Sequence, residues 1–106
     1  MINIHFLYFE DCPSHPDALA RLKQVMAEEG TDAEIRITKV ETEDEAAQWR
    51  FTGSPTIHVD GQDIAPPPAD APTMLTCRVY QLENGRMSPL PSENMIRTAL
   101  QNANNH

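Results

Sequence analysis

Cys12 is the residue of this chain whose type and position are best suited to chemistry, and His15 follows it three positions later. The thiolate is the reactive form of cysteine, so a site that uses Cys12 must lower the pKa of the thiol from about 8.5. Unpaired N–H groups at a helix start favour negative charge, and a nearby histidine can donate a hydrogen bond to sulfur. The sequence therefore predicts Cys12 as a nucleophile and His15 as a group that adjusts its pKa.

Two features of the flanking sequence oppose ionisation of Cys12. Glu10 and Asp11 directly precede it, and like charge raises the pKa of a thiol. Pro16 favours a helix capped by Ser14, with the proline in the first turn. That start leaves Cys12 in the turn before the helix, where the helix dipole acts weakly. We therefore expect a modestly activated thiol.

The hydrophobic pattern predicts an α/β domain with the element order β-α-β-α-β-β-α. Two strands joined through a helix form a right-handed parallel unit, and helices on both faces of a four-stranded mixed sheet complete the core. The predicted strands are residues 2–9, 33–40, 56–59 and 77–82, and the predicted helices are residues 14–30, 42–49 and 92–103.

The length of 106 residues fits a single domain, 1–106. Residues 62–76 contain four prolines, which disfavour regular structure, so this segment is predicted to be an irregular loop. The asparagine-rich end, residues 102–106, is predicted to be frayed.

Two motifs, together with this element order, resemble the thioredoxin superfamily. Cys12-Pro13 stands where that superfamily has its Cys-x-x-Cys, and residues 53–56, Gly-Ser-Pro-Thr, stand at its cis-proline loop. More narrowly, the chain resembles a group of small bacterial thioredoxin-like proteins that also carry an Asp-Gly turn and a Cys-Arg-x-Tyr motif. The stretches that carry this narrower resemblance are residues 7–13, 53–56, 60–61 and 77–80.

The resemblance implies a thioredoxin-like fold with a cis peptide bond between Ser54 and Pro55. In thioredoxin-like proteins this proline packs against the reactive cysteine, and the neighbouring backbone pairs with an extended substrate peptide. By the same resemblance, the substrate-facing residues are Pro13, Ser54, Pro55 and Thr56.

His15 stands where the two-cysteine form of the motif has its second cysteine, so Cys12 lacks a local disulfide partner. Three hypotheses remain. Cys12 acts as a monothiol that forms mixed disulfides with glutathione or protein thiols, or Cys77 is its second thiol, or the fold is a binding module without redox activity.

The predicted strand order argues against Cys77 as that partner. If residues 56–59 and 77–82 form a hairpin, Cys77 lies on the order of 10 Å or more from Cys12 at ~3.3 Å per residue. A disulfide requires Cα atoms within about 7 Å. Cys77 is therefore predicted to be a buried, apolar residue at a strand start.

The sequence contains only a partial set of metal ligands. Cys12 and His15 have the spacing of half a zinc site, but the sequence contains no matching second half. We expect no cofactor and no resident metal. Transient capture of a soft metal or metalloid by Cys12, with or without Cys77, remains an alternative.

Charge and composition narrow the partners and the compartment. With 16 acidic and 8 basic residues and a net charge of -8, the chain is a poor match for nucleic acid or an anionic membrane. No stretch has the length of a membrane span, and the N-terminus lacks the basic region of a signal peptide. We expect a cytoplasmic protein with reduced cysteines.

These observations together favour a thioredoxin-like protein with monothiol redox activity through Cys12. Its expected partners are protein or low-molecular-weight thiols and disulfides. The alternatives are a non-catalytic thioredoxin-fold module that binds proteins, and thiol-based binding of a soft metal.

Overall fold

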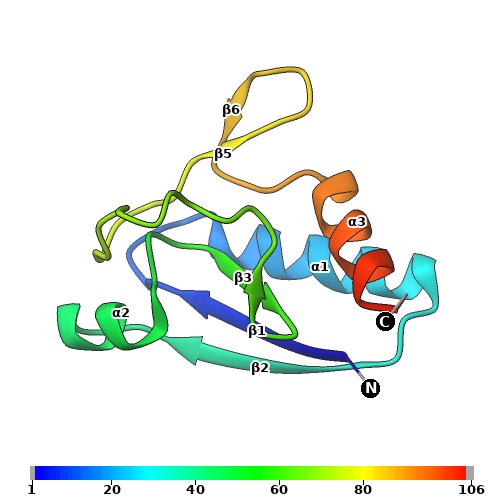
Figure 1. The fold of residues 1–106 in the computed structure, drawn as a ribbon, viewed down its shortest axis with the longest axis horizontal. Coiled ribbons are helices and arrows are strands. Elements are labelled where there is room, and N and C mark those ends of the chain that lie inside the picture. The colour runs from blue at the N-terminus through cyan, green and yellow to red at the C-terminus, as the bar shows by residue number, and fades with distance from the viewer. Residues whose placement is uncertain (1, 105–106) are drawn as a thin grey trace.

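In the computed structural model, which describes residues 2–104, four strands form one mixed sheet in the order β2-β1-β3-β4 (Figure 1). The central strand β1 (Ile2–Tyr8) runs parallel to β2 (Ala33–Lys39) and antiparallel to β3 (Thr56–Val59). The short strand β4 (Gln62–Asp63) extends the sheet beyond β3. The predicted α/β class and the mixed four-stranded sheet are confirmed.

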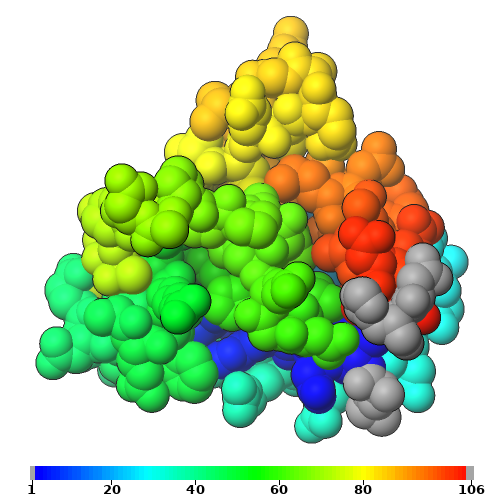
Figure 2. Space-filling model, viewed as in Figure 1, coloured from blue at the N-terminus to red at the C-terminus, as the bar shows by residue number. Residues whose placement is uncertain are grey.

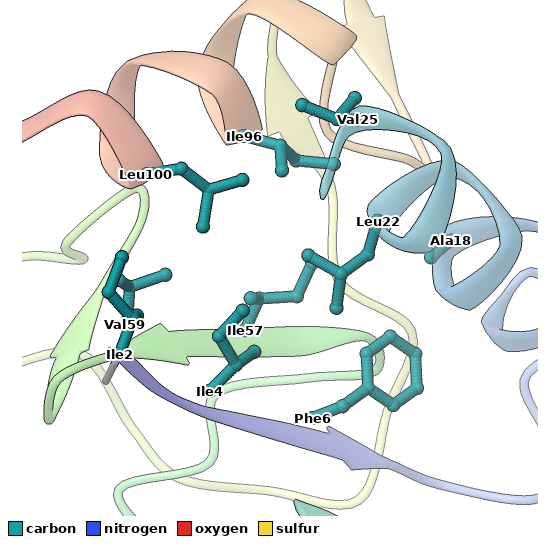
Figure 3. Packing of buried hydrophobic residues seen from close by; sticks show 10 residues of the cluster. All are labelled: Ile2, Ile4, Phe6, Ala18, Leu22, Val25, Ile57, Val59, Ile96 and Leu100. Atoms are coloured by element: carbon teal, nitrogen blue, oxygen red, sulfur yellow. The ribbon is translucent and has the colours of Figure 1, made fainter. Parts of the chain in front are cut away.

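Helices α1 (His15–Glu29) and α3 (Glu93–Asn104) lie side by side over one face of this sheet (Figure 1). Alternation along β1 directs every second side chain toward them. The close-up in Figure 3 shows apolar side chains from both layers pointing toward one another. The buried residues of this cluster are Ile2, Ile4, Phe6, Ala18, Leu22, Val25, Ile57, Val59, Ile96 and Leu100.

The start and end of α1 follow the capping signals in the sequence. Ser14 occupies the N-cap position, with Pro16 in the first turn. Gly30 ends the helix in the left-handed conformation with φ 61°, which glycine adopts without a steric penalty. This confirms the predicted helix start and leaves Cys12 in the turn that precedes α1.

The short helix α2 (Glu43–Trp49) lies against the opposite face of the sheet, near the end of β1. Its buried Ala46 packs in a second apolar cluster with Leu7, Val40 and Phe51. Thr42 caps this helix by accepting a hydrogen bond from the Glu45 backbone N–H at 3.1 Å. Helices therefore lie on both faces of the sheet.

The predicted fourth strand is wrong. Residues 62–63, not residues 77–82, pair with β3, because the turn after Val59 returns the chain directly onto that strand before the prolines begin. A separate hairpin is formed by β5 (Tyr80–Gln81) and β6 (Met87–Ser88). Figure 2 shows it projecting from the body of the molecule, in yellow and orange.

Two segments were predicted to be irregular, residues 62–76 and residues 102–106. The first is irregular apart from residues 62–63, which form β4. Residues 64–76 contain no helix or strand. Residues 102–104, where fraying is predicted, instead continue α3, because Leu100 and Ala103 pack against the core and hold its last turn. Residues 105–106 lie outside the described part of the chain. Among residues 2–104, no helix combines the length and apolar character that crossing a membrane requires.

Candidate functional site

Cys12 lies in the turn between β1 and α1, and its side chain is only 1% exposed. Its backbone N–H donates to the Phe9 carbonyl at 3.0 Å, which fixes the turn. The sulfur lies 3.3 Å from the Ser14 hydroxyl and donates to the Ser54 carbonyl at 3.4 Å. Ser14 makes no capping hydrogen bond with its side chain, so its hydroxyl faces the sulfur instead of the helix.

The loop before β3 lies directly against Cys12. The peptide bond between Ser54 and Pro55 is cis, which confirms that prediction. Ser54, Pro55 and Thr56 are all buried, and the Thr56 hydroxyl donates to the Gly53 carbonyl at 2.6 Å. These residues, expected to face a substrate, therefore pack inside the molecule, whereas Pro13 is exposed.

Cys77 lies beside Cys12, so the predicted separation of 10 Å or more is wrong. The Ser54 N–H donates to the Thr76 carbonyl, and the Arg78 N–H donates to the Ser54 carbonyl, both at 2.8 Å. This parallel bridge holds Cys77 opposite Ser54, whose carbonyl accepts a hydrogen bond from the Cys12 thiol, and the two thiols are close enough for each to shift the pKa of the other. The error arose because residues 76–78 pair with the loop that precedes β3, where β1 ends, and not with β3 itself.

Cys77 is exposed, not buried as predicted. It belongs to an extended segment in which successive side chains point in opposite directions. Val79, two positions on, is 57% exposed, whereas Arg78 and Tyr80 are buried. The Cys-Arg-x-Tyr motif thus exposes the Cys77 side chain, whereas the buried side chains of Arg78 and Tyr80 hold the segment against the rest of the molecule.

Arg78 is the main anchor of this segment. Its guanidinium pairs with the Asp63 carboxylate at 2.7 Å in a buried ion pair, and it also donates to the Ala65 carbonyl at 2.6 Å. A further hydrogen bond reaches the Thr56 hydroxyl at 3.3 Å. Since a buried ion pair needs such additional hydrogen bonds to offset desolvation, Arg78 ties residues 76–78 to both β4 and the cis-proline loop.

Tyr80 provides a second anchor. Its hydroxyl donates to the Pro55 carbonyl at 2.6 Å, and its ring lies 4.5 Å from the Arg78 guanidinium, a cation–π distance. Burial raises the pKa of Tyr80, so the hydroxyl stays protonated and can donate. Residues 77–80 stand out as a motif in the sequence, but no role was predicted for Arg78 or Tyr80. The alternation of the motif was the available signal.

The two thiols differ in acidity. Burial raises the pKa of Cys12, but hydrogen bonds from Cys77 and Ser14 outweigh burial, and the pKa is lowered overall. The Ser54 hydroxyl contributes in the same direction. The hydrogen bond to Cys12 raises the pKa of Cys77, with burial and charge adding to the effect. Cys12 therefore ionises more readily than Cys77.

The residues predicted to adjust this pKa make other contacts. The His15 ring stacks on Tyr8, with ring centres 4.4 Å apart, and His15 is absent from the groups that shift the pKa of Cys12. The Glu10 carboxylate pairs with the Lys39 ammonium at 3.2 Å. Hydroxyl and thiol groups, rather than His15, set the acidity of Cys12.

Two neighbouring thiols can be oxidised to a disulfide or can share a soft metal ion. Within residues 2–104, no group of three or more His, Cys, Asp or Glu side chains is arranged to hold a metal. Comparison of the chain with protein-family models, with curated proteins and with solved structures finds no match.

Proposed function

We propose that this chain is a thioredoxin-like thiol–disulfide redox protein whose active pair is Cys12 and Cys77. The observation that carries the proposal is the bridge between Ser54 and Cys77, which brings Cys77 next to the Cys12 thiol that donates to the Ser54 carbonyl. Oxidation removes two electrons and two protons and forms the S–S bond between them. Reduction by two thiols reverses this and yields one disulfide of the reductant.

The pair replaces the monothiol mechanism expected from the sequence. Cys12 is 1% exposed, so a disulfide from outside has little access to its sulfur. Cys77 is exposed and lies beside it across Ser54, and it supplies the second sulfur that His15 does not. In a reducing cytoplasm, the compartment we propose, the pair rests as a dithiol.

The proposed thioredoxin-like fold is supported by the arrangement around the pair. Cys12 follows the central strand and precedes α1, and the cis bond of Pro55 lies before the antiparallel strand β3. The mixed sheet with helices on both faces agrees with the same fold.

Oxidation followed by mass mapping tests the proposal. The reduced protein is treated with oxidised glutathione, alkylated in denaturant and digested with trypsin, which cleaves between the two cysteines at several Lys and Arg residues. We expect a monomer with no free thiol and a peptide pair joined through Cys12 and Cys77. The matched variants Cys12→Ser and Cys77→Ser should yield only glutathione adducts or intermolecular disulfides. A wild-type protein that remains reduced, or that yields only such adducts, would contradict the proposal.

Soft-metal binding is a second candidate, favoured by the same proximity of the two cysteines. Soft cations such as Cu(I) prefer thiolate ligands. Native mass measurement of the reduced protein with Cu(I) should then show one bound ion that either cysteine variant loses. Tight binding without reversible disulfide formation would favour this candidate over the redox function.

A further inference from the structure

Resting on the redox pair proposed above, we propose that Cys77 is the sulfur that exchanges with thiols from outside. Cys12 is then the internal sulfur, which is released as a thiolate when the disulfide opens and bonds to Cys77 again when it closes. The assignment reverses the role that the sequence suggests for Cys12. It is based on the burial of the two sulfurs, on the packing of residues 76–78, and on the hydroxyl groups around Cys12.

Access from outside is open to Cys77 alone of the pair. The Cys12 sulfur is covered by Ser14 and Ser54, and the backbone of Ser54 already pairs with residues 76–78. Cys77 is exposed and borders an open hollow of about 520 Å³, which also lies against Pro67. A thiolate that approaches the disulfide through this hollow meets the sulfur of Cys77 first.

The surroundings of Cys12 suit a leaving group. Thiol exchange is faster when the departing sulfur has the lower pKa, and hydrogen bonds lower the pKa of Cys12. The Ser14 hydroxyl lies 3.3 Å from the sulfur. The Ser54 hydroxyl is buried without a hydrogen-bond partner in the described chain, yet it is close enough to help lower that pKa. It is therefore free to donate to the thiolate that forms when the disulfide opens.

The exchange then proceeds in two steps. The thiolate of a first glutathione attacks the Cys77 sulfur and forms a mixed disulfide, while the Cys12–Cys77 bond breaks and its electron pair passes to Cys12. A second glutathione thiolate attacks the glutathione sulfur of the mixed disulfide and releases the Cys77 thiolate and oxidised glutathione. The protons lost by the two glutathione thiols end on Cys12 and Cys77. The protein gains two electrons, and two glutathiones become one disulfide.

Time-resolved mapping of the oxidised wild-type protein tests the assignment. The oxidised protein is mixed with reduced glutathione, quenched in acid and digested. We expect the first glutathione adduct on the peptide that contains Cys77. A first adduct on the peptide that contains Cys12 would overturn the assignment.

The single-thiol variants give a second, independent readout. Because exchange requires an accessible thiol, oxidised glutathione should modify Cys77 in Cys12→Ser at least about tenfold faster than it modifies Cys12 in Cys77→Ser. Equal rates, or a faster Cys77→Ser variant, would overturn the assignment. Circular dichroism of both variants checks that they are folded. If either is not, the wild-type mapping decides.

These outcomes separate the assignment from the proposed function. A reversible Cys12–Cys77 disulfide with its first adduct on Cys12 overturns only the roles of the two sulfurs. Failure of the wild-type protein to form that disulfide overturns the proposed function and this inference with it.

Discussion

Ser54 brings two different groups to Cys12. Its carbonyl accepts a hydrogen bond from the thiol at 3.4 Å, which suits the protonated form. Its hydroxyl is buried and has no partner among the described residues while Cys12 is a thiol. An unpartnered buried hydroxyl costs free energy, and a hydrogen bond to the Cys12 thiolate would recover that cost. The residue is thus suited to both protonation states of the sulfur.

Replacing Ser54 with alanine should slow the reaction without weakening the fold. Loss of a hydrogen bond to a charged group raises the pKa of the Cys12 thiol, and we expect reduction of the disulfide by glutathione to slow about tenfold. Urea unfolding should show unchanged or slightly higher stability, because a buried unpaired group is removed.

Thr31 provides the matched control for Ser54. Its hydroxyl is also buried without a partner in the described chain, but Thr31 is not among the groups that shift the pKa of Cys12. Thr31→Val should therefore leave the exchange rate unchanged. Equal rates for Ser54→Ala and Thr31→Val would show that the Ser54 hydroxyl does not act on the thiolate.

At the scale of elements, the close packing of Gly53 against Arg78 keeps the cis-proline loop, which lies against Cys12, together with the segment that carries Cys77. Gly53 has a φ of 148°, and a Cβ atom at this position would lie 2.8 Å from the Arg78 Cβ. Only glycine allows the backbone to approach so closely. The buried ion pair between Arg78 and Asp63 then holds residues 76–78 in place from the other side.

Gly53→Ala should therefore damage both stability and disulfide formation. Overpacking of this kind costs about 1–3 kcal/mol, and displacement of Arg78 moves Cys77 away from Cys12. The control is Gly85→Ala, at a φ of 85° with no atom within 4 Å of the added Cβ. Urea unfolding and the rate of disulfide formation should both be poorer for Gly53→Ala than for Gly85→Ala. Equal losses would indicate that only backbone conformation matters at Gly53.

The elements that could be predicted from the sequence are those with several turns or repeats of an apolar pattern. The central strand, α1 with its Ser14 cap, and β3 fall in this class. The two-residue strand β4 has no such pattern, and its pairing depends on the turn after Val59 and on the distant Arg78. That is why residues 77–82 were assigned to the sheet incorrectly.

The candidate site divides in the same way. The position of Cys12 between a strand and a helix follows from local patterns, and the cis bond of Pro55 was predicted through the resemblance of residues 53–56 to a cis-proline loop. The contact with Cys77 depends on an irregular segment held by Arg78 and Tyr80 through long-range contacts, for which local patterns carry no information.

For the whole molecule, a Cys12–Cys77 disulfide would connect the end of the central strand to the segment that precedes the projecting hairpin. It would close a loop of roughly 65 residues that includes α1, α2 and the sheet strands β2, β3 and β4. Cross-links across long loops restrict the unfolded chain strongly. The redox state of one pair should therefore alter the stability of the entire domain.

We expect the oxidised protein to be more stable than the reduced protein by up to about 4 kcal/mol. Urea unfolding with and without a reductant measures the difference. Cys77→Ser should unfold at the same urea concentration under both conditions. A wild-type protein in the confirmed disulfide form, yet no more stable than the reduced form, would mean that closing the bond strains the native structure by a comparable amount.

A redox titration tests the central claim, that Cys12 and Cys77 form one reversible redox pair, most directly. The protein is equilibrated in glutathione buffers of graded potential, quenched with acid, and the fraction of intramolecular disulfide is determined by mass. We expect a single two-electron transition, with about 30 mV for each tenfold change in the ratio of disulfide to dithiol, and the same curve from either direction. Accumulation of glutathione adducts in place of the intramolecular disulfide across the whole range would contradict it.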